Sequence, residues 1–542
     1  MTAFTQTDIF STAIEPEVLP FEDQAGEMAA GTGVVASGFI ELMLAQYQAR
    51  EKLIQETKDL IDNASSMGVL GYFADGFNMA HSGESRWNFA LNIEHAKAAL
   101  RAEYWGRLLN ETDIFDMMPA AKREEARSQF FGLDSPPFEE ATVRPTLTDL
   151  LAQRANWFAE RVDGVFRTLS KSHFTNQPTG FCKKMILANV FDQFGYVETY
   201  QRERINDLRA VVGRILGRGE PDGSTTGRVL RSIYTNHLGK KVSIDNGAFI
   251  VTAYKAGTLH LEVAPEVAQE LNEHLARLYP AAIPHATRKR KKERPIKNFN
   301  HENQALPFSV LRVIGEARFY TDSWIFSAGS LSKPERDLIV EVLESIGGEV
   351  LNSLPSGSMY IRFDYDAKPV LEYLARDGSV PEKVSHQFYS TADDLADRAE
   401  ELLDLQDGDE CLEPSAGTGK LAKRLPASTT TCVELARLRC QVLNAMGYKT
   451  VEADFLAWSR KNPSYRADRI LMNPPFSKNR AQLHTEAALG HLNVGGRLVA
   501  VLPASMRESF KVDGFNFEWS EVLTDQFEGT SVRVVLLKVE HA

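Results

Sequence analysis

The stretch Asp409-Glu410-Cys411-Leu412-Glu413-Pro414-Ser415-Ala416-Gly417-Thr418-Gly419-Lys420 decides the fold expected for the C-terminal part of the chain. It reads as a short apolar strand that opens into a glycine-rich loop, where glycine lets the backbone approach a ligand closely. The loop lacks the GxxxxGK(S/T) spacing of a phosphate-binding loop, because Lys420 is followed by Leu421. Glu413 would repel phosphate, so we expect a ligand with a cationic end, and a helical stretch from Leu421.

A second motif lies further along the chain, where the apolar run Arg469–Met472 leads into Asn473-Pro474-Pro475-Phe476. Each proline fixes its own φ and biases the residue before it away from the helical region, which holds Asn473 extended beyond the sheet. The amide oxygen and a neighbouring carbonyl can accept both hydrogens of one planar NH2 group, while Phe476 stacks on the ring that carries it. This geometry suits methyl transfer onto the amino group of a base. The alternative is a plain turn, since Asn-Pro-Pro is also a good turn sequence.

Over about residues 385–542, these motifs and three shorter ones resemble the amino-methylating DNA methyltransferases that use S-adenosylmethionine. The resemblance implies a C-terminal α/β domain of the Rossmann-like class I methyltransferase fold, with a seven-stranded, mostly parallel sheet. It implies adenine N6 as the acceptor, because Asn-Pro-Pro-Phe in this motif order is commoner on adenine enzymes. Cytosine N4 presents the same kind of amino group, so the chemistry of the loop alone does not separate the two bases.

The resemblance also assigns cofactor-binding residues. The segment expected to close over the methionine end contains Phe388, Tyr389 and Thr391, with Ala392 where the family has proline. The cofactor loop contains Glu413, Pro414, Ser415, Ala416, Gly417 and Gly419. Glu434 is expected to hold the ribose, as an acid after the second strand does in dinucleotide-binding folds. Asp454 and Phe455 are expected to contact the adenine amino group and ring, and Asn473 the edge of the cofactor.

The catalytic residues implied by the resemblance are Asn473, Pro474, Pro475 and Phe476. The target adenine leaves its stack, as it does in other enzymes that act on a base, and Phe476 stacks on it. The side-chain oxygen of Asn473 and the carbonyl of Pro474 accept the two N6 hydrogens. We expect no general base before attack and no metal ion.

The composition of the 542-residue chain, 43% hydrophobic, predicts more than one globular domain. A net charge of −12 argues against a general nucleic-acid binder, so phosphate contacts must come from local patches. The four cysteines form no CxxC pair, which favours a reducing compartment without a disulfide framework. Without a signal sequence or a long apolar segment, we predict a soluble cytoplasmic protein with no membrane partner.

We expect a multidomain chain in which mainly helical and α+β domains precede the methyltransferase domain. The expected segments are 1–30, a poorly ordered N-terminus; 31–170, mainly helical; 171–284, α+β; 285–303, a basic linker; 304–384, a small α/β segment; and 385–542, the methyltransferase domain. Residues from roughly 95 to 280 resemble a domain of unassigned function associated with phage- and plasmid-borne methyltransferases.

Local patterns add expectations for these segments. In the helical part, Trp105, Arg107 and Trp157 could stack on bases, but their helical spacing favours core with a solvated rim. A helix is expected from Thr146, a hairpin around Asp245-Asn246-Gly247, and a strand over Val310–Val313.

The basic run Arg288–Lys297 cannot bury itself and is a solvated linker at minimum. It is also the best sequence candidate for contacts with DNA phosphates, through Arg288, Lys289, Arg290, Lys291 and Lys292. Only a few residues follow Val539, so we expect target recognition from the segments before residue 385, with a short or relaxed sequence preference.

The sequence therefore predicts S-adenosylmethionine-dependent methylation of adenine N6 in DNA. Two alternatives remain. RNA bases or protein glutamine are methylated by similar Asn-Pro-Pro-aromatic loops, and a non-enzymatic DNA-binding protein could retain the methyltransferase fold.

Overall fold

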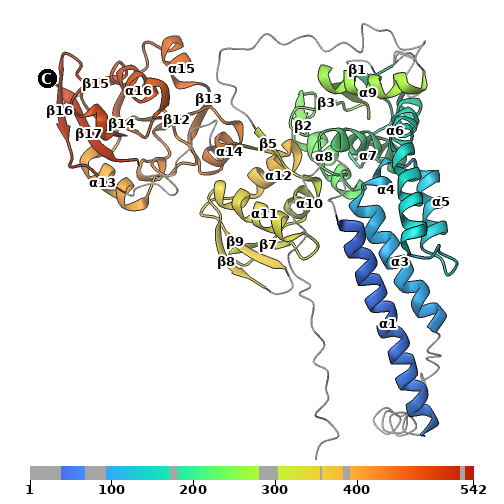
Figure 1. Cartoon of the computed structure of the whole chain (residues 1–542). Helices are drawn as coiled ribbons and strands as arrows, with labels where there is room; N and C mark the ends of the chain where they lie inside the picture. Colours follow the sequence, from blue (N-terminus) through green and yellow to red (C-terminus); the bar gives the residue numbers. More distant parts are fainter. Residues whose placement is uncertain are drawn as a thin grey trace, which may run out of the picture. The chain divides into compact units, whose positions relative to one another are not determined.

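The computed structural model describes residues 38–67, 93–170, 180–181, 184–279, 303–354, 357–382, 391–524 and 532–542. The chain divides into two compact units, Met1–Arg161 and Val162–Ala542 (Figure 1). The expected poorly ordered N-terminus, Cys182 and the basic linker lie outside the described residues. Within the described ranges, no helix combines the length and the apolarity that a membrane crossing requires.

The first unit is helical, as expected. Its helices are α1 (Phe39–Ser66), α3 (Ile93–Glu111), α4 (Ile114–Met117), α5 (Ala120–Phe130) and the first two thirds of α6 (Glu140–Ser170). Aromatic side chains form the centre of its core, where Trp105 lies against Phe130 at 4.8 Å between ring centroids and against Phe138 at 5.3 Å. Burial of such large rings is the main stabilising contribution of this unit.

The aromatic residues that could have stacked on bases belong to this core. Trp105 and Trp157 are buried, and the Arg107 guanidinium lies over the Tyr104 ring at 5.0 Å. The expected start of the third helix at Thr146 is wrong, because α6 begins at Glu140 and carries Pro145 inside it. Pro145 lies in the second turn of α6, where its missing N–H removes the helical hydrogen bond to the carbonyl of Ala141, and the helix continues beyond it to Ser170.

The second unit starts with an α+β arrangement. Its antiparallel sheet has the order β1-β4-β3-β2. The elements are β1 (Lys184–Leu187), α7 (Thr199–Ile215), α8 (Gly223–Asn236), β2 (Val242–Ile244), β3 (Phe249–Ala253), β4 (Leu259–Val263) and α9 (Pro265–Leu278). The expected hairpin is confirmed, because Asp245 and Asn246 have φ values of 54° and 57° in the turn between β2 and β3. Both values lie in the left-handed region that this hairpin turn requires.

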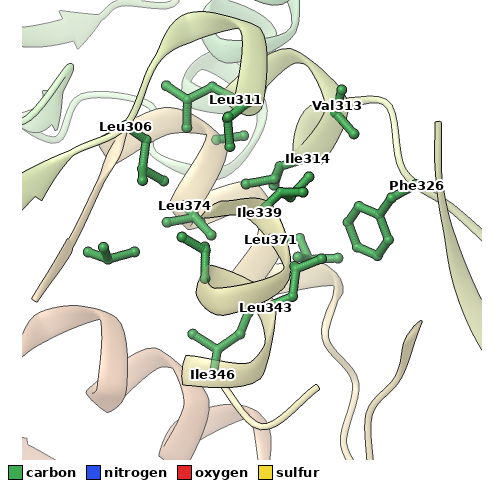
Figure 2. Close-up of a cluster of buried hydrophobic side chains, with 14 of the residues drawn as sticks. Leu306, Leu311, Val313, Ile314, Phe326, Ile339, Leu343, Ile346, Leu371 and Leu374 are labelled. Atoms are coloured by element: carbon green, nitrogen blue, oxygen red, sulfur yellow. The ribbon is translucent and has the colours of Figure 1, made fainter. Parts of the chain in front are cut away.

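The next segment packs three helices on one face of a second antiparallel sheet, of order β6-β7-β9-β8. The elements are β5 (Asn303–Ala305), α10 (Phe308–Gly315), β6 (Arg318–Tyr320), β7 (Ser323–Ser327), α11 (Lys333–Ser345), β8 (Glu349–Ser353), β9 (Ser358–Arg362), α12 (Lys368–Asp377) and β10 (Ser379–Pro381). Figure 2 shows their aliphatic core. The expected strand over Val310–Val313 is wrong, because α10 contains it. The run is short and contains one polar residue, Arg312, among apolar neighbours, which is too little periodicity to separate a buried helix from a strand.

Buried polar contacts tie this segment to the preceding one. The Arg218 guanidinium donates to the carbonyls of Leu306 and Gly378, each at 2.9 Å, and lies 4.6 Å from the centroid of the Phe308 ring. Nearby, Arg209 forms a buried bidentate pair with Asp245 at 2.7 and 2.8 Å. The Arg209–Asp245 pair lies within the preceding segment, where removal of one partner would leave a buried charge unpaired, and the Arg218 hydrogen bonds join the two segments.

The C-terminal part forms a seven-stranded sheet of order β13-β12-β11-β14-β15-β17-β16. The strands are β11 (Cys411–Glu413), β12 (Thr430–Glu434), β13 (Lys449–Glu452), β14 (Ala467–Met472), β15 (Leu492–Pro503), β16 (Phe515–Trp519) and β17 (Val534–His541). All pairs from β13 to β15 are parallel, whereas β17 runs antiparallel to both of its neighbours. The expected mostly parallel α/β sheet is therefore present.

Helices cover both faces of this sheet. The helices are α13 (Asp393–Leu403), α14 (Arg437–Ala445), α15 (Phe455–Lys461) and α16 (Arg480–Leu489). Leu471 packs with α13, whereas its neighbours Ile470 and Met472 pack with α15 and α16 on the other face. The helix expected from Leu421 is only a single 3-10 turn, Ala422–Arg424, because Pro426 follows it closely.

Candidate active site

The register of the parallel strands brings the two sequence motifs to one edge of the sheet. Leu412 of β11 pairs with Ile470 of β14, so Ser415 and Asn473 each follow three residues beyond that pair. On the other side of β11, Glu434 ends β12 and pairs with Glu452 at the end of β13. The carboxyl ends of parallel strands are where ligands bind in open α/β sheets.

The glycine-rich loop after β11 is held by the carboxylate of Glu434. Its Oε2 accepts the N–H of Gly417 and its Oε1 accepts the N–H of Ala436, both at 2.8 Å. Arg439 on α14 lies 3.7 Å from the same carboxylate. Gly417 has φ of +56°, a backbone conformation that favours glycine. Glu434 therefore anchors the loop at the end of β12.

Glu413 is the most deeply buried acidic side chain among the described residues of the site. Its side chain is 1% exposed, and its Oε2 has no hydrogen-bond partner among the described residues. Burial, and then the nearby charge of Glu434, raise the pKa of the Glu413 carboxyl well above its usual range. A buried carboxyl oxygen without a partner is costly, and a cationic ligand would satisfy it.

Asp454 lies at the same edge, at the start of α15. Its Oδ1 accepts the N–H of Ala457 at 3.0 Å, and its Oδ2 is paired with Arg480. Burial acts to raise the pKa of Asp454, but the Ala457 N–H and the Arg480 guanidinium outweigh it and hold the pKa below its usual range. The adjacent Phe455 is 2% exposed and packs in the core, 5.9 Å from Trp458 between ring centroids.

Asn473 begins the acceptor loop with its amide already oriented. Its Nδ2 donates to Thr391 Oγ1 at 3.1 Å, across 82 residues of sequence. This bond turns the Oδ1 atom away from Thr391, and no described residue donates to that oxygen. Pro474 is buried. Phe476 is half-buried and packs against the hydrophobic clusters on both faces of the sheet. The loop thus presents an oriented amide oxygen beside an aromatic ring.

Two residues of α16 belong to the site although the sequence did not indicate them. Besides the Arg480 pair with Asp454, His484 Nδ1 lies 3.1 Å from Ser415 Oγ in the cofactor loop. Burial first, and then Arg480, lower the pKa of His484 to about 4, so the imidazole is neutral at pH 7. The sequence did contain a signal for them. Arg480 and His484 are four residues apart on the helix after the acceptor loop, and this spacing places both side chains on one helix face.

Some expected site residues lie outside the described part of the chain. These are Phe388 and Tyr389, and the basic residues Arg288, Lys289, Arg290, Lys291 and Lys292. In the ranges that are described, no three histidine, cysteine, aspartate or glutamate side chains gather as metal ligands. The described site therefore combines an acidic cradle with an amide acceptor, which suits a cationic ligand beside an amino-bearing one.

Comparison with known proteins gives one sequence-family match. A model described as a domain of unknown function, DUF4942, matches residues 97–281. This range is less than half of the chain and coincides with the part that resembled a domain of unassigned function. No curated protein matches the chain.

Solved structures also resemble part of the chain. TrmN from Thermus thermophilus is 18% identical, with a TM-score of 0.24, over 39% of this chain and 68% of TrmN. An rRNA methylase from Streptococcus thermophilus is 15% identical, with a TM-score of 0.21, over 27% of this chain and 93% of the methylase. A structure of the type I R-M system is 17% identical, with a TM-score of 0.25, over 30% of this chain and 43% of that one. These values are too low to transfer an activity, so the function is inferred from the geometry of the site.

Proposed function

We propose that the protein transfers a methyl group from S-adenosylmethionine to the N6 amino group of adenine in DNA. The observation that carries the proposal is the orientation of Asn473 at the end of β14, where Thr391 holds the amide nitrogen at 3.1 Å. This leaves Oδ1 as a hydrogen-bond acceptor at the same edge as the acidic, glycine-rich loop after β11. Amino methylation needs a hydrogen-bond acceptor for the amino group of the base, beside a site that binds the positively charged methyl donor.

The residues around the loop fit S-adenosylmethionine, which supplies a methyl group on a positively charged sulfur. The orphaned Glu413 Oε2 offers a buried partner for a cationic ligand. Glu434 would accept ribose hydroxyls with the lone pairs that the loop N–H groups leave. Asp454 would accept from the adenine amino group only by sharing its Oδ2 with Arg480.

The acceptor loop would orient the target base and stabilise the developing charge. Asn473 Oδ1 and the Pro474 carbonyl accept the two N6 hydrogens, and Phe476 stacks on the ring. As the nitrogen becomes positive these two acceptors strengthen, so the loop stabilises the transition state more than the bound base. His484 is neutral at pH 7 and buried, and this scheme needs no base before attack.

The substrate is tested by incubating purified protein with S-adenosylmethionine carrying an isotopically labelled methyl group. Equal amounts of duplex DNA, single-stranded DNA, total RNA and protein extract are offered, then digested and analysed by mass spectrometry. We expect the label in N6-methyl-2′-deoxyadenosine from DNA. Label in N4-methylcytosine, in RNA or in glutamine would contradict the proposed acceptor, and absence of label from all of them would support a non-enzymatic DNA-binding protein.

We also expect cofactor binding to release a proton from Glu413. In the ligand-free protein, burial and Glu434 raise the pKa of this carboxyl, and Cys432 and Tyr448 lie close enough to interact with it. A cationic ligand favours the carboxylate and lowers that pKa. Between the usual pKa near 4.5 and the raised value, binding therefore releases a proton and affinity rises with pH. Above the raised value, affinity no longer depends on this group.

Calorimetry in buffers of different ionisation enthalpy counts the protons released on binding. We expect release in the wild type and none from this group in Glu413→Gln, which keeps the shape of the side chain. Equal proton release by both proteins, or proton uptake by the wild type, would contradict the role of Glu413.

A further inference from the structure

Helices α7 and α8 lie within the residues matched by the domain of unknown function (Figure 1). Aromatic and arginine side chains lie in the turn before α7, at the start of α7 and on α8. Phe194, Tyr196 and Tyr200 are 72%, 52% and 69% exposed. The Arg231 guanidinium lies 4.1 Å from the centroid of the Tyr196 ring, and that of Arg204 lies 5.3 Å from the Tyr200 ring. These five residues are called the tyrosine–arginine surface below.

The turn that carries Phe194 and Tyr196 is fixed in place. Asp192 Oδ1 accepts the N–H groups of both residues at 2.8 Å. A Cβ atom on Gly195, which has φ of +81°, would come within 2.4 Å of the Tyr234 ring on α8, so the turn packs directly on that helix. An aromatic ring on a pinned turn loses little conformational entropy when a ligand stacks on it.

The guanidinium of Arg231 is exposed, so its charge is accessible to a ligand, whereas Arg204 is only 7% exposed and its Nη1 donates to Gln201 Oε1 at 3.0 Å. Arg202 of the same helix is paired with Glu203 at 2.7 Å. In contrast, neither Arg204 nor Arg231 forms an ion pair with any residue in the described part of the chain. Each lies over a tyrosine ring instead. In a chain with a net charge of −12, the exposed Arg231 without a carboxylate partner, beside exposed aromatic rings, favours an anionic, aromatic ligand.

We propose that the tyrosine–arginine surface binds a single strand of DNA whose bases are unstacked. The rings would stack on successive bases, which every base permits, and the guanidinium of Arg231 would contact a phosphate. A duplex hides its base faces, so an exposed ring platform favours an unpaired strand. The choice of DNA over RNA rests on the proposed function, in which the acceptor is DNA and the enzyme acts on a single strand or flips the target adenine out of its pair.

Fluorescence anisotropy of a short labelled DNA strand, without cofactor, tests the surface on the full-length protein. We expect Tyr196→Ala and Tyr200→Ala each to raise the dissociation constant about fivefold or more, and together about 25-fold or more. Tyr200→Phe should bind within about twofold of the wild type, because the stacking ring remains. Arg231→Gln should lower the slope of log affinity against log salt by about one unit.

Tyr320→Ala is the matched control, since Tyr320 on β6 is 68% exposed and lies outside the surface. If this control weakens strand binding as much as Tyr200→Ala does, the surface is not specific and the proposal fails. Loss of binding in Tyr200→Phe equal to that in Tyr200→Ala would also overturn stacking. Tighter binding of duplex DNA, or of RNA of the same sequence, would overturn the assigned ligand.

The test separates this proposal from the proposed function. Wild-type strand binding by the Tyr196→Ala/Tyr200→Ala protein would reject the surface and leave methyl transfer standing. Loss of strand binding by that protein, together with no methylation of DNA by the wild type, would reject the proposed function and keep the surface.

Discussion

Replacing Asn473 with alanine should lower the rate constant for methyl transfer by about 10² to 10³-fold. The amide oxygen is held toward the acceptor by the bond from Nδ2 to Thr391, and it would strengthen its contact only as the amino nitrogen gains charge. Because the residue contacts chiefly the acceptor, the dissociation constant of S-adenosylmethionine should change by about twofold at most. Single-turnover kinetics and calorimetry measure the two quantities separately.

Asn444→Ala provides the control for this variant. Asn444 is exposed on α14 and its side chain makes no hydrogen bond to a described residue, so this change should leave both quantities unaffected. If Asn473→Ala loses cofactor affinity and rate in the same proportion, the residue holds the cofactor rather than the acceptor, and the assignment of the loop is wrong.

Gly417→Val should raise the dissociation constant of S-adenosylmethionine by about 100-fold. A β-branched residue at φ of +56° is strongly strained, at a cost of about 1–3 kcal/mol. Relief of that strain would move the N–H that binds Glu434 and distort the loop, and 3 kcal/mol corresponds to about 100-fold in affinity.

Gly408→Val separates the effect on the site from the effect on the backbone. Gly408 has φ of +87° and no atom within 4 Å of an added Cβ, so its substitution brings similar strain away from the loop. We expect both variants to unfold at lower temperature, and only Gly417→Val to lose cofactor affinity. Equal affinity of the two variants would mean that the loop after β11 does not hold the cofactor.

The C-terminal sheet could be predicted because its signals are local. The glycine-rich loop and the proline-rich loop each follow a short apolar run, and each run became a parallel strand that ends at the site. The hairpin at Asp245 and Asn246 was predictable for the same reason, since its turn requires particular residues. Strand ends and turns depend on a few adjacent residues, which the sequence displays directly.

Other features depend on contacts between distant residues. The run Val310–Val313 is short and apolar except for Arg312, so its pattern fits a strand or a helix, and the surrounding core makes it a helix. The pairing of Arg480 with Asp454, and of Thr391 with Asn473, follows from tertiary packing and leaves no spacing signal between the partners. The tyrosine–arginine surface likewise joins residues of α8 to a turn that precedes α7.

The most direct test of adenine methylation compares DNA from cells that lack N6-methyladenine after expression of wild-type protein, Asn473→Ala protein or no protein. Long-read modification sequencing reports the modified base and its sequence context together. We expect N6-methyladenine only with the wild type, in a short or relaxed context. DNA without modified adenine in wild-type-expressing cells, with methyl label found in RNA, protein or cytosine, would contradict the proposed function.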